Sequence, residues 1–475
     1  SIGEHGGSSC SRLPHHRAHL LRRGHLGTGL PESVLAAACA AAGKTVLHVD
    51  PNPFYGSLYS SVPLPSLPSF LSPEPSPVPL PPSGDDSRTV VDLHHRNIFS
   101  EVEISGAAPE PSARIAVDLV GPRVLYCRDE AVDLLLRSGG SHHAIFGNTA
   151  TLNHTEKTFL FNLFKLVRAH IAAADEDGES EASDKISEED LDLPFIKYLK
   201  KHQLQPKMIA GVLYAIAMAD YDQDTDCSEK LLIAREGIQT IALYSSSIGR
   251  FANAQGAFMY PMYGHGELPQ AFCRCAAVKG ALYVLRMPVS ALLMDEQCYI
   301  CFDMTPSLHL ALEEQQIAAI RVLQLSSNLA VCPPGMFMVY LSTPCADTST
   351  GTQCIKKAID ALFAPQASDP LEGHLEETSE NNEDLKPTVI WSCVYAQEIM
   401  EGTSSSLLSC PTPDEHLDYR SILDSSKKVL HCILHLIGMY LHQNYGSMLF
   451  ADICPNEEFL PNTAIYADDD SDSAE

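Results

Sequence analysis

The sequence has little positive charge and almost no tryptophan: 32 Lys and Arg residues stand against 60 Asp and Glu residues, and there is one Trp in 475 residues. The net charge of −28 argues against a nucleic-acid-binding protein, because binding to phosphates needs a basic surface that displaces counterions. Long apolar runs are also lacking. The longest, 208–219, suits a core helix and falls short of the roughly 18 residues that span a membrane.

Common catalytic and metal-binding motifs are absent as well. There is no Gly-x-Ser-x-Gly and no His-Glu-x-x-His, which argues against a serine hydrolase of that type and against a zinc protease. The 15 cysteines are scattered and no secretory leader is evident, which is typical of reduced thiols in the cytosol. The closest pairs, Cys298 with Cys301 and Cys273 with Cys275, lack the spacing of two zinc knuckles. We therefore expect no metal site.

The chain does have enough apolar residues for a sizeable core. Hydrophobic residues make up 45% of it, and 475 residues allow two to four domains at roughly 100–200 residues each. Much of the acidic charge is gathered in three runs, at 175–190, 369–384 and 468–472. Because runs of like charge repel one another, we expect these runs to be loops and tails in solvent.

The sharpest local pattern is Gly27-x-Gly29-x-x-Glu32, followed by an apolar strand at 45–49 and by Asp50. This order is typical of a dinucleotide-binding β-α-β unit, in which glycines admit a pyrophosphate and the acid binds a ribose hydroxyl. Glu32 takes the place of the third glycine, where its carboxylate would repel a pyrophosphate. Residues before the first glycine make a poor strand, so we expect that strand to be missing. The pattern therefore predicts the fold but no flavin or nicotinamide cofactor.

The hydrophobic pattern as a whole predicts a mixed α/β (α+β) fold. We expect a FAD/NAD(P)-binding-like domain with a degenerate dinucleotide motif, interrupted by an inserted all-helical domain. Predicted helices lie at 31–42, where Pro31 suits the first turn and a run of alanines follows, and at 156–170, 195–201, 207–219, 229–246, 269–278 and 425–443. Predicted strands lie at 45–49, 116–119, 123–126, 281–286, 320–330 and 336–342.

These elements divide the chain into six predicted parts. They are a disordered leader at 1–26; the first α/β part at 27–126, with a Pro-rich loop at 62–90; a helical domain at 127–246, with an acidic loop at 174–190; the second α/β part at 247–365; an acidic linker at 366–387; and a C-terminal part at 388–475 with an acidic tail.

Two longer blocks carry a resemblance to a known family. The first reads Gly-Thr-Gly-Leu-Pro-Glu-Ser at 27–33 and continues at 46–56; the second covers 249–251 and 260–274 and contains Tyr-Gly-His-Gly-Glu-Leu-Pro-Gln. Both are similar to conserved blocks of Rab escort proteins and Rab GDP dissociation inhibitors. Pro31 and the run Cys-Arg-Cys-Ala-Ala-Val at 273–278 resemble the escort branch more, and 320–343 looks like plant escort proteins.

The resemblance implies a platform on the α/β domain for GDP-bound Rab and a helical domain that shelters geranylgeranyl chains. The implied Rab-binding residues are Tyr55, Glu267, Arg274 and Val284, which match family positions, and Arg250 and Tyr283, which lie beside them. For Arg250 and Glu267, the alternative is an internal salt bridge that shapes the turn predicted at 264–267. The prenyl-groove candidates are Phe159, Leu163, Leu166, Ile209 and Leu213, each of which is also explained as ordinary helix core.

The function that the resemblance implies is that of a Rab escort protein, the non-catalytic accessory component A of Rab geranylgeranyltransferase. Such a cytosolic protein binds GDP-bound Rab, slows GDP release, presents the Rab to the α/β heterodimer of the transferase and delivers it transiently to membranes. The alternatives are a Rab GDP dissociation inhibitor that recycles prenylated Rab, a flavin oxidoreductase of the same fold, and a nonfunctional truncated product. The last stays open because the family carries longer stretches at 148–154 and 302–317.

Overall fold

The structure is a computed structural model, and it describes 14 stretches of the chain. They are residues 23–73, 88–92, 97–143, 146–148, 163–172, 186–202, 204–224, 231–252, 255–289, 291–295, 318–364, 386–399, 410 and 412–427. The prenyl-groove candidate Phe159 and the cysteine pair Cys298 and Cys301 lie outside the described residues.

A three-stranded parallel sheet holds the glycine motif. Its strands are β1 (Arg23–Leu26), β2 (Val46–Val49) and β10 (Leu282–Val284), in the order β1-β2-β10. The helix α2 (Leu30–Ala41) connects the two parallel strands β1 and β2, so the first β-α-β unit is complete. Because β10 comes from a distant part of the chain and pairs with β2, the α/β domain is assembled from two separated segments.

Small residues let two helices pack closely beside this sheet. Pro31 lies in the first turn of α2, where its missing N–H costs no helical hydrogen bond, and Ala36, Ala37 and Ala38 are buried. The helix α10 (Glu267–Val278) packs along α2, with Ala271, among others, in the shared core. This core also takes in α4 (Glu130–Arg137), which Asp129 caps with a hydrogen bond to the Ala131 N–H.

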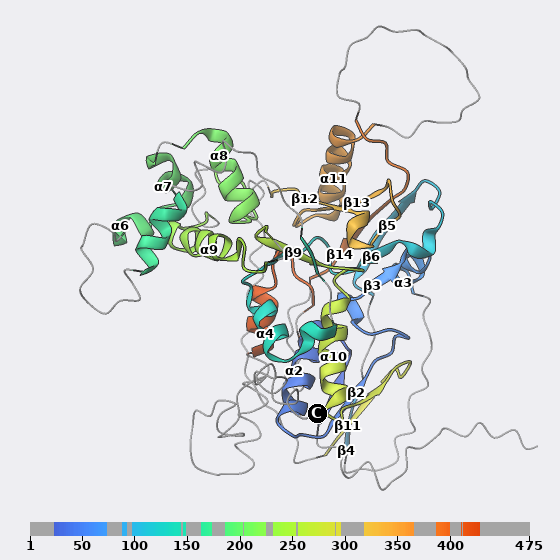
Figure 1. Ribbon diagram of the computed structural model, residues 1–475. Coiled ribbons are helices and arrows are strands. Elements are labelled where there is room, and N and C mark those ends of the chain that lie inside the picture. The colour runs from blue at the N-terminus through green and yellow to red at the C-terminus, as the bar shows by residue number, and fades with distance from the viewer. Residues whose placement is uncertain are drawn as a thin grey trace, which may run out of the picture.

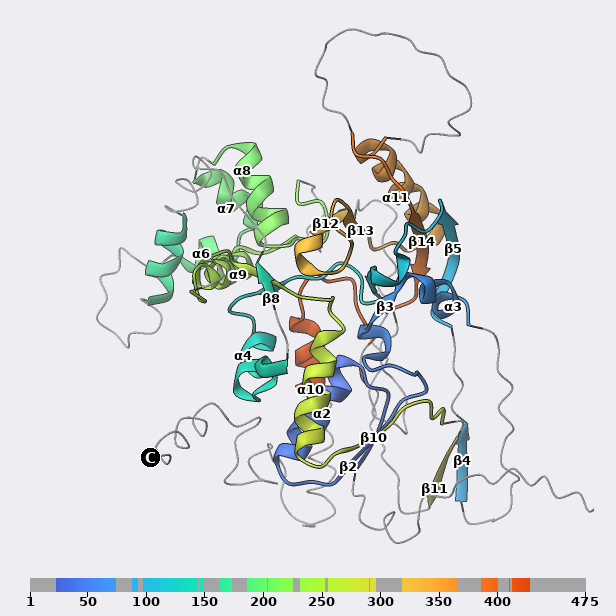
Figure 2. The same ribbon diagram turned by 45° about the vertical axis from the view of Figure 1, so that its right-hand side comes forward.

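Short antiparallel ribbons form a second, β-rich part. The pairs are β3 (Ser61–Pro63) with β6 (Ala116–Asp118), β5 (Phe99–Ser105) with β14 (Ser392–Gln397), and β12 (Arg321–Ser326) with β13 (Phe337–Ser342); β9 (Phe258–Pro261) lies between β7 (Leu125–Tyr126) and β8 (Phe146–Asn148). The helices beside them are α3 (Leu67–Leu71) and α11 (Thr348–Leu362), with short 3-10 turns η1 (Ser57–Tyr59), η2 (Leu64–Ser66), η3 (Ser112–Arg114), η4 (Gly140–His143) and η7 (Ser327–Leu329). A separate ribbon of β4 (Arg88–Asp92) and β11 (Ala291–Asp295) lies at the lower end of the α/β part (Figure 1 and Figure 2).

The third part is helical and has a core of its own. It contains a helix at 163–172, α6 (Glu188–Leu191), α7 (Phe195–Lys201), α8 (Pro206–Ala210), the π-helical turn η5 (Gly211–Ile216) and α9 (Ala234–Ser247). Its buried residues, among them Val167, Phe195 and Ile241, form one cluster apart from the α/β core. A further helix at 420–427 packs back on the α/β core.

The three parts are distinct in space. Figure 1 shows the helices α6–α9 as a lobe to one side, with α2, α10 and β2 in a lower α/β part and β5, β13, β14 and α11 in an upper part. After a 45° turn, Figure 2 still separates the helical lobe from the strands β5 and β14. The predicted fold class, an α/β domain with an inserted helical domain, is confirmed.

Three details of the sequence prediction were wrong. The first strand is present, as β1, inside the segment 1–26 predicted to be a disordered leader. The predicted Pro-rich loop 62–90 contains β3, η2 and α3, because Leu64, Leu67 and Leu71 recur at helical spacing and are buried. The helix α4, placed by the sequence in the helical domain, packs on the α/β core.

Candidate functional site

The glycine loop is held by hydrogen bonds to a buried side chain, Asp50. The Asp50 side chain follows β2 and accepts hydrogen bonds at Oδ2 from the Thr28 N–H (2.7 Å), the Thr28 hydroxyl (2.6 Å) and the Ser57 hydroxyl (2.7 Å). Its Oδ1 accepts from the backbone and side-chain N–H groups of Asn52, at 2.8 and 2.9 Å. Asp50 is fully buried, so the acid that would bind a ribose hydroxyl instead fixes the loop to the end of β2.

The side chain of Glu32 fills the place of a pyrophosphate over the same loop. A Cβ atom on Gly29 would lie 2.5 Å from Glu32 Oε2 and 3.1 Å from Tyr59 Cδ2, while Gly27 has a positive φ of 85°. Burial raises the pKa of Glu32 to about 7, against the lowering effect of its own backbone N–H and of the Cys410 thiol. Within the described residues, Oε2 has no hydrogen-bond partner. The residues present do not fit a dinucleotide, because its acidic pyrophosphate group would face the carboxyl group of Glu32.

Three aromatic rings meet at the end of the parallel sheet. The Tyr283 ring on β10 lies 5.0 Å from the His48 ring on β2 and 5.7 Å, edge to face, from the Tyr55 ring. Burial lowers the pKa of His48 to about 4, so the imidazole is neutral at physiological pH and donates from Nε2 to the Gly27 carbonyl oxygen. Tyr55 is half-buried and so combines a fixed ring with an exposed edge.

The predicted residues of α10 lie on the exposed side of that helix. Arg274 is exposed, and Glu267, at the first turn, is half-buried. Burial raises the pKa of Glu267, and the nearby positive charge of Arg274 opposes this shift. Val284 is half-buried, and its carbonyl oxygen accepts a hydrogen bond from the Asp50 N–H at 3.0 Å. The sheet therefore links Tyr55, Tyr283 and Val284 to the glycine loop.

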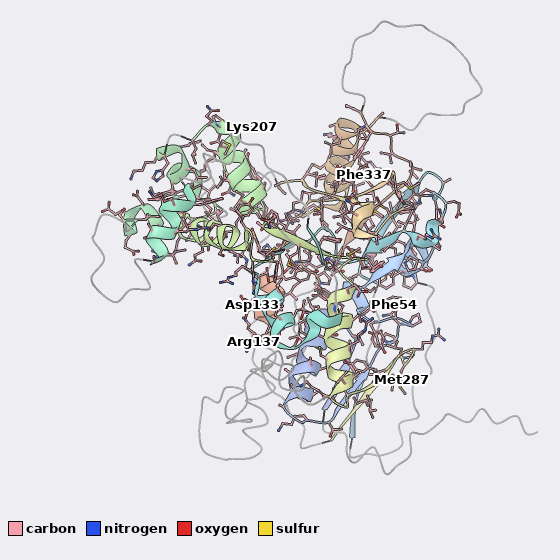
Figure 3. The ribbon with its side chains drawn as sticks, in the orientation of Figure 1. Phe54, Asp133, Arg137, Lys207, Met287 and Phe337 are labelled. Atoms are coloured by element: carbon pink, nitrogen blue, oxygen red, sulfur yellow. The ribbon has the colours of Figure 1, made fainter. Side chains whose placement is uncertain are left out.

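Arg250 is turned toward the protein. Its guanidinium forms an ion pair with Asp133 on α4, donates to the Cys127 carbonyl oxygen at 2.5 Å, and stacks over the Phe251 ring at 5.2 Å. Only 13% of the side chain is exposed. Figure 3 labels Asp133 on α4, below the helical lobe. This arrangement fits the internal salt bridge that the sequence left open, so we do not carry Arg250 into a binding surface.

The turn before α10 is held from inside by a carboxylate that the sequence did not single out. Asp118 Oδ1 accepts hydrogen bonds from the His265 N–H at 2.8 Å and from the Ser61 hydroxyl, and Oδ2 accepts from the Tyr260 hydroxyl. Ser61 Oγ in turn accepts from the Gly266 N–H at 2.8 Å. No side chain fits at Gly264, where a Cβ would collide with Ser61 and Asp118 and φ is +101°.

An apolar pocket of about 590 Å³ lies between the helical lobe and β12. Tyr214 and Met218 line it from the helical side, and Ile320 and Val322 line it from the strand side. Tyr214, Ile320 and Val322 are more than a third exposed.

The predicted prenyl-groove residues within the described stretches do not line this pocket. Leu163, Ile209 and Leu213 are buried in the helical core, Leu166 is half-buried, and none of the four lines the pocket. Apolar spacing alone does not separate residues of a helix core from residues of a groove, so the prenyl-groove assignment stays a prediction.

The stretches that the structure describes form neither a metal site nor a membrane-spanning helix. No group of three His, Cys, Asp or Glu side chains is placed to hold a metal ion. Cys273 and Cys275 are buried on α10, where burial raises the pKa of the Cys273 thiol to about 11 and that of the Cys275 thiol above its usual range. None of the described helices is both long and apolar enough to cross a bilayer.

Comparison with known proteins gives the class of the chain. The family model described as GDP dissociation inhibitor matches residues 179–305, and a model described as RAE1/2 domain I, C-terminal region, matches residues 304–415. A crystal structure of Rab GDI from Plasmodium falciparum superposes with a TM-score of 0.52 at 15% identity, over 86% of this chain and 97% of that one. The fold is thus that of the GDP dissociation inhibitors.

Curated relatives narrow the class to one family. Rab escort protein 1 of Arabidopsis thaliana is 38% identical over 85% of this chain and 91% of its own length. Rab proteins geranylgeranyltransferase component A of Drosophila melanogaster is 30% identical, and component A 1 of Homo sapiens is 23% identical. They align with 57% and 73% of this chain, and the chain spans 53% and 58% of their lengths. The chain belongs to the Rab escort protein family.

Proposed function

We propose that this chain binds GDP-bound Rab and presents it for C-terminal geranylgeranylation, as the accessory component of the transferase. The observation that carries the proposal is the glycine loop closed by Glu32 and Asp50. A dinucleotide-type domain whose cofactor position is filled by its own carboxyl group retains the fold as a rigid support. The relatives' names, Rab escort protein and geranylgeranyltransferase component A, supply the partner.

The proposed Rab-binding surface consists of Tyr55, Tyr283, Val284, Glu267 and Arg274. The tyrosine pair offers a fixed aromatic anchor, which binding surfaces favour because little conformational entropy is lost. The exposed guanidinium of Arg274 and the carboxyl group of Glu267 provide one charge of each sign for pairing with a partner.

The pocket between the helical lobe and β12 is the proposed shelter for prenyl chains. A geranylgeranyl chain has 20 carbons, and each buried CH₂ contributes about 0.8 kcal/mol. Transfer of the chain from water into an apolar pocket is therefore favourable. Its volume of about 590 Å³ falls within the range typical of ligand pockets. Tyr214 and Met218 take the place of the buried leucines that the sequence favoured.

The proposed role is not catalytic. The name component A, which the relatives carry, supports an accessory role, and burial raises the pKa of the thiols of Cys273 and Cys275 on α10, which makes them poor nucleophiles. The chain would supply positioning: it would bring the Rab C-terminus to the catalytic α/β heterodimer, keep the prenylated product in the cytosol and release it at a membrane.

A second candidate function is that of a GDP dissociation inhibitor that recycles prenylated Rab. The match of residues 179–305 to the GDP dissociation inhibitor family favours it, since that span includes most of the helical lobe and all of α10. Binding to the transferase heterodimer separates the two. Retention of a Rab·GDP complex on immobilised heterodimer only when the chain is present supports the escort role. Rab·GDP binding by the chain, without retention on the heterodimer, supports the recycling role.

A further inference from the structure

A short C-terminal segment, residues 412–427, is built into the α/β core. Tyr419, Ile422 and Leu423 are 1%, 1% and 2% exposed and join the core that contains α2 and α10. The fully buried Arg123 anchors the segment: its guanidinium donates to the Asp418 carbonyl oxygen, and to the Asp414 carbonyl oxygen (2.7 Å) and carboxylate (2.5 Å). Three of these hydrogen bonds come from the two terminal nitrogens of the guanidinium, while Nε has no partner within the described residues, so the pair fixes geometry more than it adds stability.

The hydroxyl group of Tyr419 reaches from this segment to the turn before α10. Tyr419 Oη lies 2.8 Å from His265 Nδ1, and His265 Nε2 lies 2.9 Å from the Arg123 carbonyl oxygen. A carbonyl oxygen only accepts, so Nε2 carries the proton and Nδ1 accepts from the tyrosine hydroxyl. Burial lowers the pKa of His265, against the raising effect of Asp118, which keeps the imidazole neutral and this polarity of hydrogen bonds fixed.

His265 is therefore held on two sides. Its backbone N–H donates to Asp118, and its ring is fixed between Tyr419 and the Arg123 carbonyl oxygen. Glu267, two residues on, begins α10 and belongs to the proposed Rab-binding surface. The side chains of Tyr260 and Tyr419 both contact the His265 ring, with centroids 4.4 and 5.5 Å away. The path from Tyr419 to Glu267 runs through His265 and Gly266, whose N–H donates to Ser61 Oγ at 2.8 Å.

We propose that Tyr419 is a positioning residue for partner binding. It fixes the turn 264–267 and thereby the start of α10 and the position of the Glu267 carboxyl group. The segment that carries Tyr419 does not itself contact the partner. The proposal rests on the proposed Rab-binding function. It gives the segment 412–427 a part in affinity and not only in folding. The segment is distant in sequence from every residue of the proposed surface.

The substitution Tyr419→Phe tests this with the smallest change, the loss of one hydroxyl group. We expect the dissociation constant for a GDP-bound Rab to rise about three- to ten-fold, the equivalent of one buried hydrogen bond. We also expect hydrogen exchange at the His265 and Gly266 amides to become about five-fold faster. The matched control is Tyr126→Phe, which removes a buried hydroxyl that donates to the Ile216 carbonyl oxygen at 2.5 Å, toward the helical lobe.

The control separates positioning from stability. Both variants lose one buried hydrogen bond and should lower the melting temperature alike, but Tyr126→Phe should leave Rab affinity and exchange in the turn unchanged. Asp414→Asn, which weakens the anchor of the segment, should act in the same direction as Tyr419→Phe. Unchanged affinity or unchanged exchange in the turn for Tyr419→Phe overturns the proposal. If the wild-type chain does not bind Rab·GDP, the proposed function fails, and the exchange data alone decide whether Tyr419 sets the turn.

Discussion

The carboxyl group of Glu32 lies directly over Gly29: a Cβ on that glycine would be 2.5 Å from Glu32 Oε2. In a dinucleotide-binding domain this space receives phosphate oxygens. Here the glycine is required because a side chain of the protein itself needs the room. The relationship explains how a chain can keep the fold of a cofactor-binding domain while the residues of its loop do not fit the cofactor.

Replacing Glu32 by Gln should change how stability depends on pH. The pKa of Glu32 is about 7 in the folded chain, against an ordinary value of 4.5, so the folded state holds the proton more tightly than the unfolded chain does. Wild-type stability should therefore fall as pH rises from about 4.5 to 7 and stay low above it. We expect Glu32→Gln to remove this loss of stability. Relative to wild type, the unfolding free energy of the variant should be higher by on the order of 1–3 kcal/mol at pH 8 and almost equal at pH 4.5. Urea unfolding at both pH values measures it.

Asp129 provides the internal control for that experiment. Burial raises its pKa to about 7 as well, so the wild-type chain carries two such groups. The Asp129 contribution is the same in wild type and Glu32→Gln and cancels in their difference. If wild type and Glu32→Gln differ in unfolding free energy by the same amount at pH 4.5 and at pH 8, folding does not raise the pKa of Glu32, and the account of the loop is wrong.

Arg250 should matter for stability and not for Rab affinity. Its ion pair with Asp133 and its hydrogen bond to the Cys127 carbonyl oxygen tie the segment after α9 to α4. We expect Arg250→Ala to lower the unfolding free energy by about 1–3 kcal/mol, since partners are left unpaired. A double-mutant cycle with Asp133→Ala should give a coupling of about 0.5–2 kcal/mol. A large loss of Rab·GDP affinity in the folded variant would contradict this assignment.

Arg274 should show the opposite behaviour. Its side chain is exposed on α10, so Arg274→Ala should change the unfolding free energy by no more than about 0.5 kcal/mol. Because an exposed charge in a binding surface steers association, we expect Rab·GDP affinity to fall about three- to ten-fold, with a weaker dependence on salt. Lys207 is a suitable control, because Figure 3 places it at the outer end of the helical lobe. Equal affinity of Arg274→Ala and wild type would remove Arg274 from the surface.

The pocket and the helical core should respond to different substitutions. Met218→Glu places a charge in the pocket and should weaken binding of prenylated Rab at least about ten-fold, while binding of unprenylated Rab stays the same. Leu213→Ala, in the core, should instead lower the unfolding free energy by about 2–5 kcal/mol. Titration with both forms of Rab and urea unfolding of both variants measure the contrast. Loss of unprenylated Rab binding by Met218→Glu would contradict the lipid role.

Helices whose signals lie within a few residues of the element could be predicted from the sequence. Pro31 and the run of alanines after it predict α2, and the spacing of apolar residues predicts α9 and α10, because these signals lie within a few residues of the element. The strand β1 was missed because its sequence, Arg-Gly-His-Leu, lacks an apolar pattern; its backbone pairing with β2 defines it. The helix α3 was missed because proline was taken to exclude a helix, although Pro68 lies in the first turn, where proline is tolerated.

Some features of the candidate site could be read from the sequence for the same reason, and their part in Rab binding stays a prediction. The glycine motif and the turn 264–267 are local patterns, and a family resemblance pointed to Tyr55 and Arg274. The network around Asp118 was not predictable, because it joins residues as far apart as Asp118, His265 and Tyr419 that only the folded chain brings together. The sequence left Arg250 open between the surface and an internal salt bridge, because position in the sequence does not show which way a side chain turns.

The measurement that tests the central claim most directly is geranylgeranylation of a Rab by the purified α/β heterodimer, with and without this chain. The account predicts transfer of the prenyl group only when the chain is present, with a rate that rises with the chain and levels off once Rab·GDP is saturated. Arg274→Ala should need a higher concentration to reach the same final rate. Equal transfer without the chain, or no transfer although the chain is folded, would contradict the escort function.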